Sequence, residues 1–193
     1  MPNTASVIFS QEERHYTYKD YKGWELAPGE RFELIDGDAY EMAAPNLNHQ
    51  GIVAMLTARF FTFLEGKPCN VYPAPLDVRL FYEEDESDDT VVQPDLTVIC
   101  DKKKRGEEGC RGAPDLVVEV LSPSNSAIEM ERKLGLYEEA GVREYWVVDP
   151  QNKRIRVYRL SGVHFDMQRY SEGVIASTVL PGLEIALESV FAE

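Results

Sequence analysis

The stretch Pro114-Asp115-Leu116-Val117-Val118-Glu119-Val120-Leu121 is an apolar, strand-like run with an acidic residue in its interior. Glu119 interrupts an otherwise unbroken hydrophobic strand, and an unpaired buried carboxylate is costly even after the protein relaxes around it. Such a side chain needs a compensating partner. A divalent cation shared with a second carboxylate is the simplest candidate, and it points to a metal-dependent enzyme.

Two aspartates that each follow a proline are candidates for the second carboxylate. Asp115 lies four residues before Glu119 on the same strand, roughly 13 Å away at the usual rise per residue. One metal ion cannot bridge that gap, because its oxygen ligands lie about 2.0–2.6 Å from it. Asp95, in the second strand-like run 91–99, is reachable at about 5 Å if the two strands are neighbours. The sequence therefore favours Asp95 as the partner of Glu119.

A lysine on the following helix is a third candidate. Lys133 shares one face of a predicted helix over 127–140 with residues at helical spacing, namely Met130, Leu134 and Tyr137. The lysine either extends outward to solvent or meets a phosphate or an activated water beside the acids. Two acids and one lysine suit metal-assisted phosphodiester hydrolysis, in which the lysine positions the nucleophile or stabilises developing charge.

The wider pattern predicts an α/β fold with a mixed sheet in a single domain over 1–193, whose first 15 residues are flexible. Helices are expected at 18–24, 48–65 and 127–140, single strands at 75–81, 91–99, 114–121 and 144–149, and hairpins over 31–42 and 154–170. The core order is thus a helix, three strands, a helix and a strand, with extra antiparallel strands at both ends. Asn48 is the expected cap of the long helix, and Ser126 with Glu129 resembles a capping box.

Composition limits the class of protein. The net charge of −14 disfavours tight non-specific binding of nucleic acid by a monomer. No apolar run is long enough to span a bilayer and no signal peptide is recognised, so a cytoplasmic protein is expected. Three cysteines without CxxC spacing argue against a disulfide framework and a structural zinc site. The acidic run 83–89 is expected to be solvated.

The motifs also resemble a known family. The relevant segments are Gln93-Pro94-Asp95, Glu119-Val120-Leu121-Ser122-Pro123-Ser124, Lys133-Leu134-Gly135-Leu136-Tyr137 and Ala140-Gly141-Val142-Arg143-Glu144-Tyr145-Trp146-Val147-Val148-Asp149-Pro150. They are similar to the Uma family of the PD-(D/E)XK, or restriction-endonuclease-like, superfamily. The similarity runs from about Tyr16 to Leu183, with 114–150 the most specific part. The resemblance implies an αβββαβ core and a Mg²⁺- or Mn²⁺-dependent endonuclease acting on DNA, often as a homodimer.

The resemblance also implies roles for residues. Asp95 matches the first metal-ligand aspartate of the superfamily and Glu119 its second acid, and the main-chain carbonyl of Val120 would be a further metal ligand. Leu121 stands where the superfamily has its lysine, a departure shared by Uma-type sequences, in which the helix lysine corresponding to Lys133 takes over. His49 is placed close to the metal, where it would accept a proton or contact substrate.

Structural alternatives stay open for each of these residues. Glu119 and Lys133 would also fit an ion pair with no catalytic role, and His49 would fit a polar residue near a helix start. Asp77 is either an extra acidic ligand or, slightly favoured, a partner of Arg79. Glu33 is either part of the site wall or a hairpin-pairing residue. The basic run 102–105 is interpreted as a solvated loop rather than a phosphate contact.

Two other functions compete with the nuclease. The fold could serve as a non-catalytic, dimeric binding or interaction module, which Leu121 and the net charge favour. A metal-dependent hydrolase of a small phosphoester is a third, weaker option, and a narrow pocket in place of an open groove would support it.

Overall fold

The computed structural model describes residues 14–122 and 127–192. The expected flexible start therefore falls almost wholly outside the described residues, as does Ser126 of the expected capping box. Among the described residues, no helix is both long enough and apolar enough to cross a membrane.

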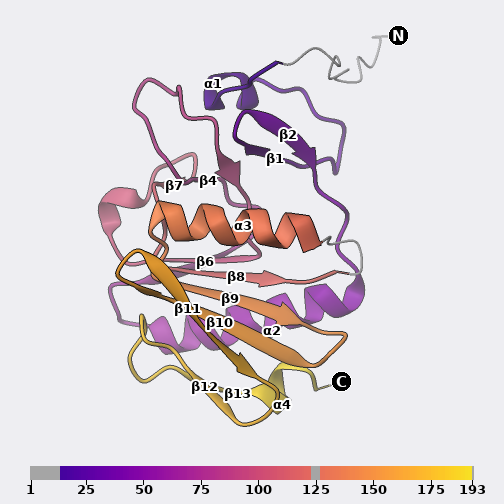
Figure 1. Cartoon of the computed structure of the whole chain (residues 1–193), viewed down its shortest axis with the longest axis vertical. Coiled ribbons are helices and arrows are strands. Elements are labelled where there is room, and N and C mark those ends of the chain that lie inside the picture. Colours follow the sequence, from indigo (N-terminus) through magenta and orange to yellow (C-terminus); the bar gives the residue numbers. More distant parts are fainter. Residues whose placement is uncertain (1–13, 123–126, 193) are drawn as a thin grey trace.

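A mixed six-stranded sheet forms the centre of the fold and confirms the predicted α/β class (Figure 1). In spatial order its strands are β11 (His164–Tyr170), β10 (Arg154–Ser161), β9 (Glu144–Asp149), β8 (Leu116–Val120), β6 (Leu96–Ile99) and β3 (Asn70–Pro73). Only β8 and β9 pair in parallel; the other neighbours are antiparallel. The predicted adjacency of the Asp95 and Glu119 strands is confirmed, because β6 pairs with β8.

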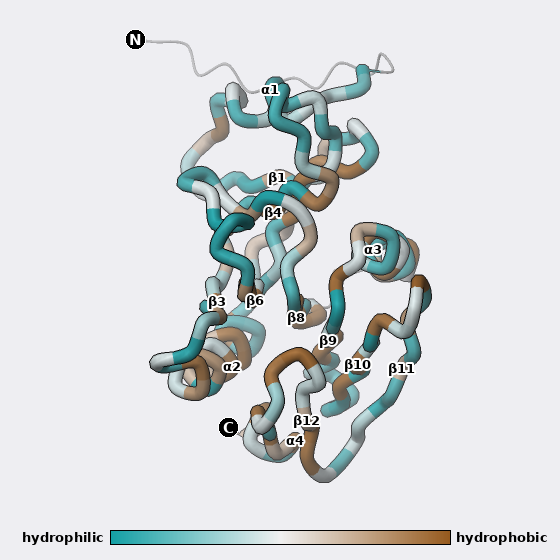
Figure 2. The backbone as a smooth tube through the Cα atoms, turned by 90° about the vertical axis from the view of Figure 1, so that its left-hand side faces the viewer, coloured by the Kyte–Doolittle hydropathy of each residue, from teal (hydrophilic) through white to brown (hydrophobic). Residues whose placement is uncertain are grey.

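Two helices cover opposite faces of this sheet (Figure 2). The helix α2 (Leu47–Leu64) packs on the face that Val118 and Val120 share. The helix α3 (Ala127–Ala140) packs on the face of Val117. Glu119 follows the same alternation as Val117, so its side chain points to the α3 side.

A second sheet of five short strands lies above α3 in Figure 1, on the side of the main sheet that α3 covers. Its order is β2 (Asp38–Glu41), β1 (Phe32–Ile35), β5 (Val91–Val92), β4 (Val78–Arg79) and β7 (Cys110–Arg111). The predicted hairpin is confirmed as β1–β2, with Asp36 and Gly37 both at positive φ, as a tight primed turn requires. The short helix α1 (Tyr18–Tyr21) packs on this sheet, and the expected basic loop is a 3₁₀ turn, η1 (Lys102–Lys104).

The C-terminal part adds a small hairpin, β12 (Val174–Ala176) with β13 (Glu184–Ala186), and the helix α4 (Leu187–Val190). Glu144 fastens this segment to β9. Its fully buried carboxylate accepts hydrogen bonds from the indole of Trp146 and from the backbone N–H groups of Thr178 and Val179.

Several local expectations are wrong. The run 91–99 is not one strand, because β5 and β6 belong to different sheets. Only residues 78–79 of the expected strand 75–81 are in a strand, and the first strand of the main sheet is β3, which was not expected. The long helix begins at Leu47, and its cap is Asn46, whose side chain accepts the N–H of His49.

The acidic run is also less solvated than expected. Asp88 is buried and forms an ion pair with Arg79, whose guanidinium lies over the rings of Tyr18 and Tyr82. The sequence suggested that Arg79 pairs with Asp77, and this prediction is wrong, because Arg79 pairs with Asp88. The Asp88 pairing takes one member of the charge run into the interior of the smaller sheet.

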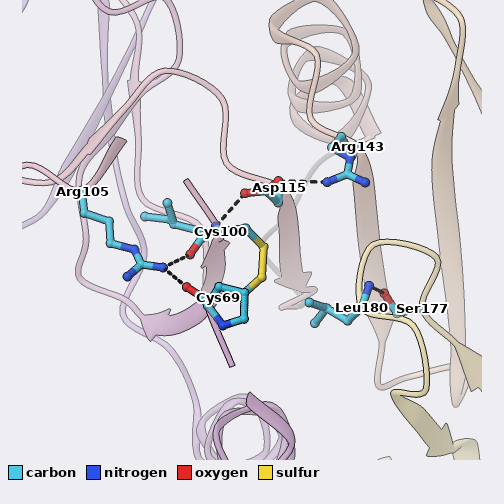
Figure 3. The surroundings of a disulfide bond; sticks show 9 residues. Cys69, Cys100, Arg105, Asp115, Arg143, Ser177 and Leu180 are labelled. Atoms are coloured by element: carbon cyan, nitrogen blue, oxygen red, sulfur yellow. Dashed lines mark hydrogen bonds and ion pairs between the residues drawn. A yellow bond between two sulfur atoms is a disulfide. The ribbon is translucent and has the colours of Figure 1, made fainter. Parts of the chain in front are cut away.

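The sequence argued against a disulfide framework, but the structure contains one disulfide bond. Cys69 and Cys100 are joined across the ends of β3 and β6, where they stand opposite one another in the antiparallel register (Figure 3). The N–H of Cys100 donates to Asp115, and Arg105 donates to the carbonyls of Pro68 and Ile99 on either side of the bond. Cys110 stays free and buried.

Candidate active site

A pocket of about 400 Å³ lies where the end of β8, the start of β6 and the first turns of α2 and α3 meet the β1–β2 hairpin. All five residues proposed for the site line it: Asp95, Glu119, Val120, Lys133 and His49. The structure thus brings together side chains that are up to 84 positions apart in the sequence, from His49 to Lys133.

Asp95 sits directly before β6, where the chain passes from the smaller sheet to the main one. Its Oδ2 atom accepts the backbone N–H of Val120 at 2.8 Å and lies 3.1 Å from Nε2 of His49. The first turn of α2 carries His49, so the helix start, the end of β8 and the start of β6 meet at one carboxylate. These contacts fix the orientation of Asp95 toward the pocket.

Glu119 and Lys133 form the buried part of the site. Nζ of Lys133 donates to Oε1 of Glu119 and to Oε1 of Glu33, both at 2.9 Å. Tyr137, one turn further along α3, donates its hydroxyl to Oε1 of Glu119 at 2.8 Å. All four residues are at most 8% exposed. The predicted helix face is confirmed, and the lysine turns inward instead of extending to solvent.

Glu33 belongs to this centre, which sequence reasoning left undecided. It lies in β1 of the smaller sheet, lines the pocket, and its Oε1 also accepts the backbone N–H of Gln93 at 2.9 Å. The signal was present in the sequence, because Glu33 interrupts the buried strand Phe32–Ile35 as Glu119 interrupts its own. Tyr137 was placed on the inner face of the helix, but its contact with Glu119 was not expected.

The electrostatics follow from this crowding. Burial raises the pKa of Glu119 to about 7, with further repulsion from Asp95 and Glu33 and partial relief from Lys133. Burial alone would lower the pKa of Lys133, but the charges of Glu119 and Glu33 outweigh it and raise that pKa well above the usual range. Burial likewise opposes the charged form of His49, yet the hydrogen bond and charge of Asp95 raise its pKa. The lysine is therefore a fixed cation held between acids.

These residues fit a divalent cation. Among the described residues, no hydrogen-bond donor meets Oδ1 of Asp95 or Oε2 of Glu119, and the buried Nδ1 of His49 has no partner. Three or more ligating side chains do not converge anywhere in the described part of the chain. A two-carboxylate site is the kind that Mg²⁺ uses when water and phosphate oxygens complete its shell.

Other candidate residues lie elsewhere. Asp77 accepts hydrogen bonds from Tyr21 and Gln93 and does not line the pocket. The basic run 102–105 is likewise remote from it, and Lys104 donates to the carbonyl of Ala113. Leu121, at the expected lysine position, lines the pocket and packs in the core beneath α3.

Comparisons with known proteins agree with the fold. The sequence model of the Uma2 family, described as "Putative restriction endonuclease", matches residues 18–188. Two uncharacterized proteins of Synechocystis sp. strain PCC 6803 are 30% identical over 141 residues and 26% identical over 149 residues, covering 72% and 76% of this chain and 72% and 81% of their own lengths. A crystal structure from Anabaena variabilis ATCC 29413, described as "a putative nuclease belonging to DUF820", superposes with a TM-score of 0.73 at 18% identity, over 92% of this chain and 98% of that one.

Proposed function

Since this chain belongs to the Uma2 family, we propose that it is a metal-dependent endonuclease that hydrolyses phosphodiester bonds of DNA. The observation that supports this most is the meeting of Asp95, Glu119 and Lys133 in one pocket, with the lysine already desolvated and charged. These are the groups that metal-assisted hydrolysis of a phosphodiester requires.

Asp95 and Glu119 would hold the ion, with the main-chain carbonyl of Val120 as a further ligand. Mg²⁺ or Mn²⁺ bound there supplies a water of lowered pKa and offsets the negative charge of the phosphate. Lys133 places its ammonium beside this centre and stabilises the charge that develops on the phosphate oxygens. His49 and the N–H of Val120 hold the Asp95 carboxylate in position.

Lys133 is suited to take the role of the superfamily's usual lysine, whose position is occupied by Leu121 in this chain. Its ammonium lies 2.9 Å from Glu119, so it reaches the second acid from α3 instead of from β8. Glu33 balances its charge from the opposite side at the same distance. A cation held by two hydrogen bonds loses little further freedom when a phosphate arrives, which favours electrostatic stabilisation of the transition state.

The test is cleavage of labelled DNA oligonucleotides, both single-stranded and duplex, with Mg²⁺ or Mn²⁺. The wild type is compared with Asp95→Asn, Glu119→Gln and Lys133→Met. Asp115→Asn is the matched control, because Asp115 also follows a proline but lies at the far end of β8, paired with Arg143. We expect metal-dependent cutting by the wild type and the control, and a loss of at least about 100-fold in the three site variants.

Equal cutting by all variants would assign the activity to a contaminant or to another site. A folded wild type that neither cuts nor binds Mn²⁺ in calorimetry would refute the enzyme and favour the non-catalytic interaction module.

A further inference from the structure

The pocket above the acids has two walls that come from different parts of the chain. One wall is the β1–β2 hairpin with the residues on either side of it, which contribute Arg31, Tyr40 and Met42. The other is the first two turns of α3, which contribute Ile128 and Arg132. The carboxylates lie between these walls, so a ligand that reaches them must pass the hairpin and the helix.

A cation–aromatic pair joins the two walls. Cζ of Arg132 lies 4.5 Å from the centroid of the Tyr40 ring, with the guanidinium over the ring face. Both residues are half-buried and both line the pocket. Guanidinium planes and aromatic rings are the surfaces on which proteins stack unpaired nucleobases. The carboxylates of the site and the Arg132–Tyr40 pair thus line one cavity.

The size and charge of the site favour a small occupant. A pocket of about 400 Å³ is in the range of small-molecule sites and not of a groove that holds a double helix. The acidic side chains Glu33, Glu41, Asp95, Glu119 and Glu129 all line it, and the whole chain carries a charge of −14. Binding along many duplex phosphates would meet repulsion, whereas one phosphate at a bound cation would not.

We propose that this pocket takes one unstacked nucleotide of single-stranded DNA, whose base stacks on the Arg132–Tyr40 pair while its phosphate lies at the cation that Asp95 and Glu119 are proposed to hold. The inference rests on the proposed nuclease function and narrows its substrate to a strand whose bases are free. Arg132 and Tyr40 determine specificity, because a base held in a duplex cannot reach them. Enzymes that act on an extruded base use a pocket in the same way.

The experiment measures binding and cleavage separately. Fluorescence anisotropy at 0.1 M salt with Ca²⁺ compares a labelled 15-nucleotide single strand with the duplex of the same sequence, and Mn²⁺ then starts cleavage. The variants are Tyr40→Ala, Tyr40→Phe and Arg132→Gln. Arg111→Gln is the matched control, because the exposed Arg111 also lies over an aromatic ring, that of Tyr82, away from the pocket.

We expect the single strand to bind at least tenfold more tightly than the duplex. Tyr40→Ala and Arg132→Gln should weaken its binding by about 5- to 100-fold, the usual loss for one stacked base. Tyr40→Phe keeps the ring and should bind like the wild type, as should Arg111→Gln.

Equal or tighter binding of the duplex would overturn the inference, and so would unchanged binding by folded Tyr40→Ala and Arg132→Gln. The two proposals fail in different ways. Single-strand binding that depends on Tyr40 without any cleavage would refute the nuclease alone. Cleavage of duplex that depends on Asp95 but not on Tyr40 would refute the single-strand inference alone.

Discussion

Nε2 of His49 lies 3.1 Å from Oδ2 of Asp95, the same oxygen that accepts the backbone N–H of Val120 at 2.8 Å. The histidine is held at the start of α2 by the cap Asn46, which accepts its N–H. The carboxylate is therefore oriented by two donors from two elements, and its other oxygen is left for the pocket. In the proposed site, His49 would thus be a residue that positions a metal ligand, Asp95.

Replacement of His49 tests that role. We expect His49→Ala to weaken Mn²⁺ binding by about 10- to 100-fold, the usual effect of losing a partner of a metal ligand. Isothermal titration calorimetry measures the affinity directly. The control is His164→Ala, which removes an exposed histidine paired with Glu138. Unchanged Mn²⁺ affinity in His49→Ala would contradict an orienting role.

Removal of the buried cation should destabilise the fold. Lys133→Met leaves Glu33 and Glu119 buried without their shared partner, and breaking such a pair costs about 3–5 kcal/mol. Urea unfolding measures the loss, and adding Glu33→Gln to Lys133→Met should recover part of it by removing one buried charge. The exposed Lys102→Met should change stability little. If Lys133→Met is as stable as the control, the contacts of Lys133 with Glu33 and Glu119 do not hold the two sheets together.

Asp77 should make stability depend on pH. Burial raises the pKa of its carboxyl. The hydrogen bonds from Gln93 and Tyr21 lower that pKa, but the effect of burial is larger. The folded state therefore keeps this proton to a higher pH than the unfolded state, and its contribution to stability falls as pH rises through that interval. Asp77→Asn removes the effect, so its stability relative to wild type should improve as the pH rises through and above the usual range of an aspartate.

The measurement for Asp77 is urea unfolding at a series of pH values. The exposed Asp166→Asn on β11 is the matched control. A relative stability of Asp77→Asn that worsens with rising pH would contradict the sign of the shift.

The cross-strand disulfide should show in both thiol counts and stability. Under non-reducing conditions the unfolded protein should expose one thiol, that of Cys110, and three after reduction. Closing a loop with a sequence separation of 31 is worth about 3–4 kcal/mol in the chain-entropy account. Cys69→Ser with Cys100→Ser should lose about that much in urea unfolding. Three free thiols without reductant would contradict the pairing.

Local signals predicted much of the fold. The hairpin around Asp36-Gly37, the helix α3 and the strand β9 were expected within a few residues, because turn chemistry and side-chain period act over short distances. The run 91–99 was misread as one strand, because the alternation of side chains along a segment does not indicate which sheet the segment joins. Pro94 has no N–H for a ladder, and the chain changes sheets there.

The errors that involve charge and sulfur have the same origin. Asp88 looked solvated within its acidic run, but its partner Arg79 lies in the strand β4, before that run. An odd number of cysteines means that they cannot all be paired, but it still allows one disulfide bond. The bond between Cys69 and Cys100 depends on the strand β3, which no sequence pattern indicated. Each case turns on a pairing between segments that the sequence does not place side by side.

The site was more predictable because its members break local patterns. Glu119 interrupts an apolar strand, and Lys133 lies on the inner face of a helix. Glu33 carries the same signal, but a hairpin role explained it equally well. The contact between Glu33 and Lys133 could not be predicted, because it depends on how the smaller sheet packs against the rest of the fold.

The contact between Lys133 and Glu33 has a consequence for the order of folding. Lys133 and Glu33 are 100 positions apart, whereas Lys133 and Glu119 are 14 apart. The ammonium therefore gains its second acid only when the N-terminal hairpin docks, a step that pays a long-loop closure. A chain without that hairpin would keep both proposed metal-binding acids but lack Tyr40 and the counter-charge of the lysine. Assembly of the proposed site and docking of the hairpin are thus expected to occur together, so that partly folded chains would lack the complete site.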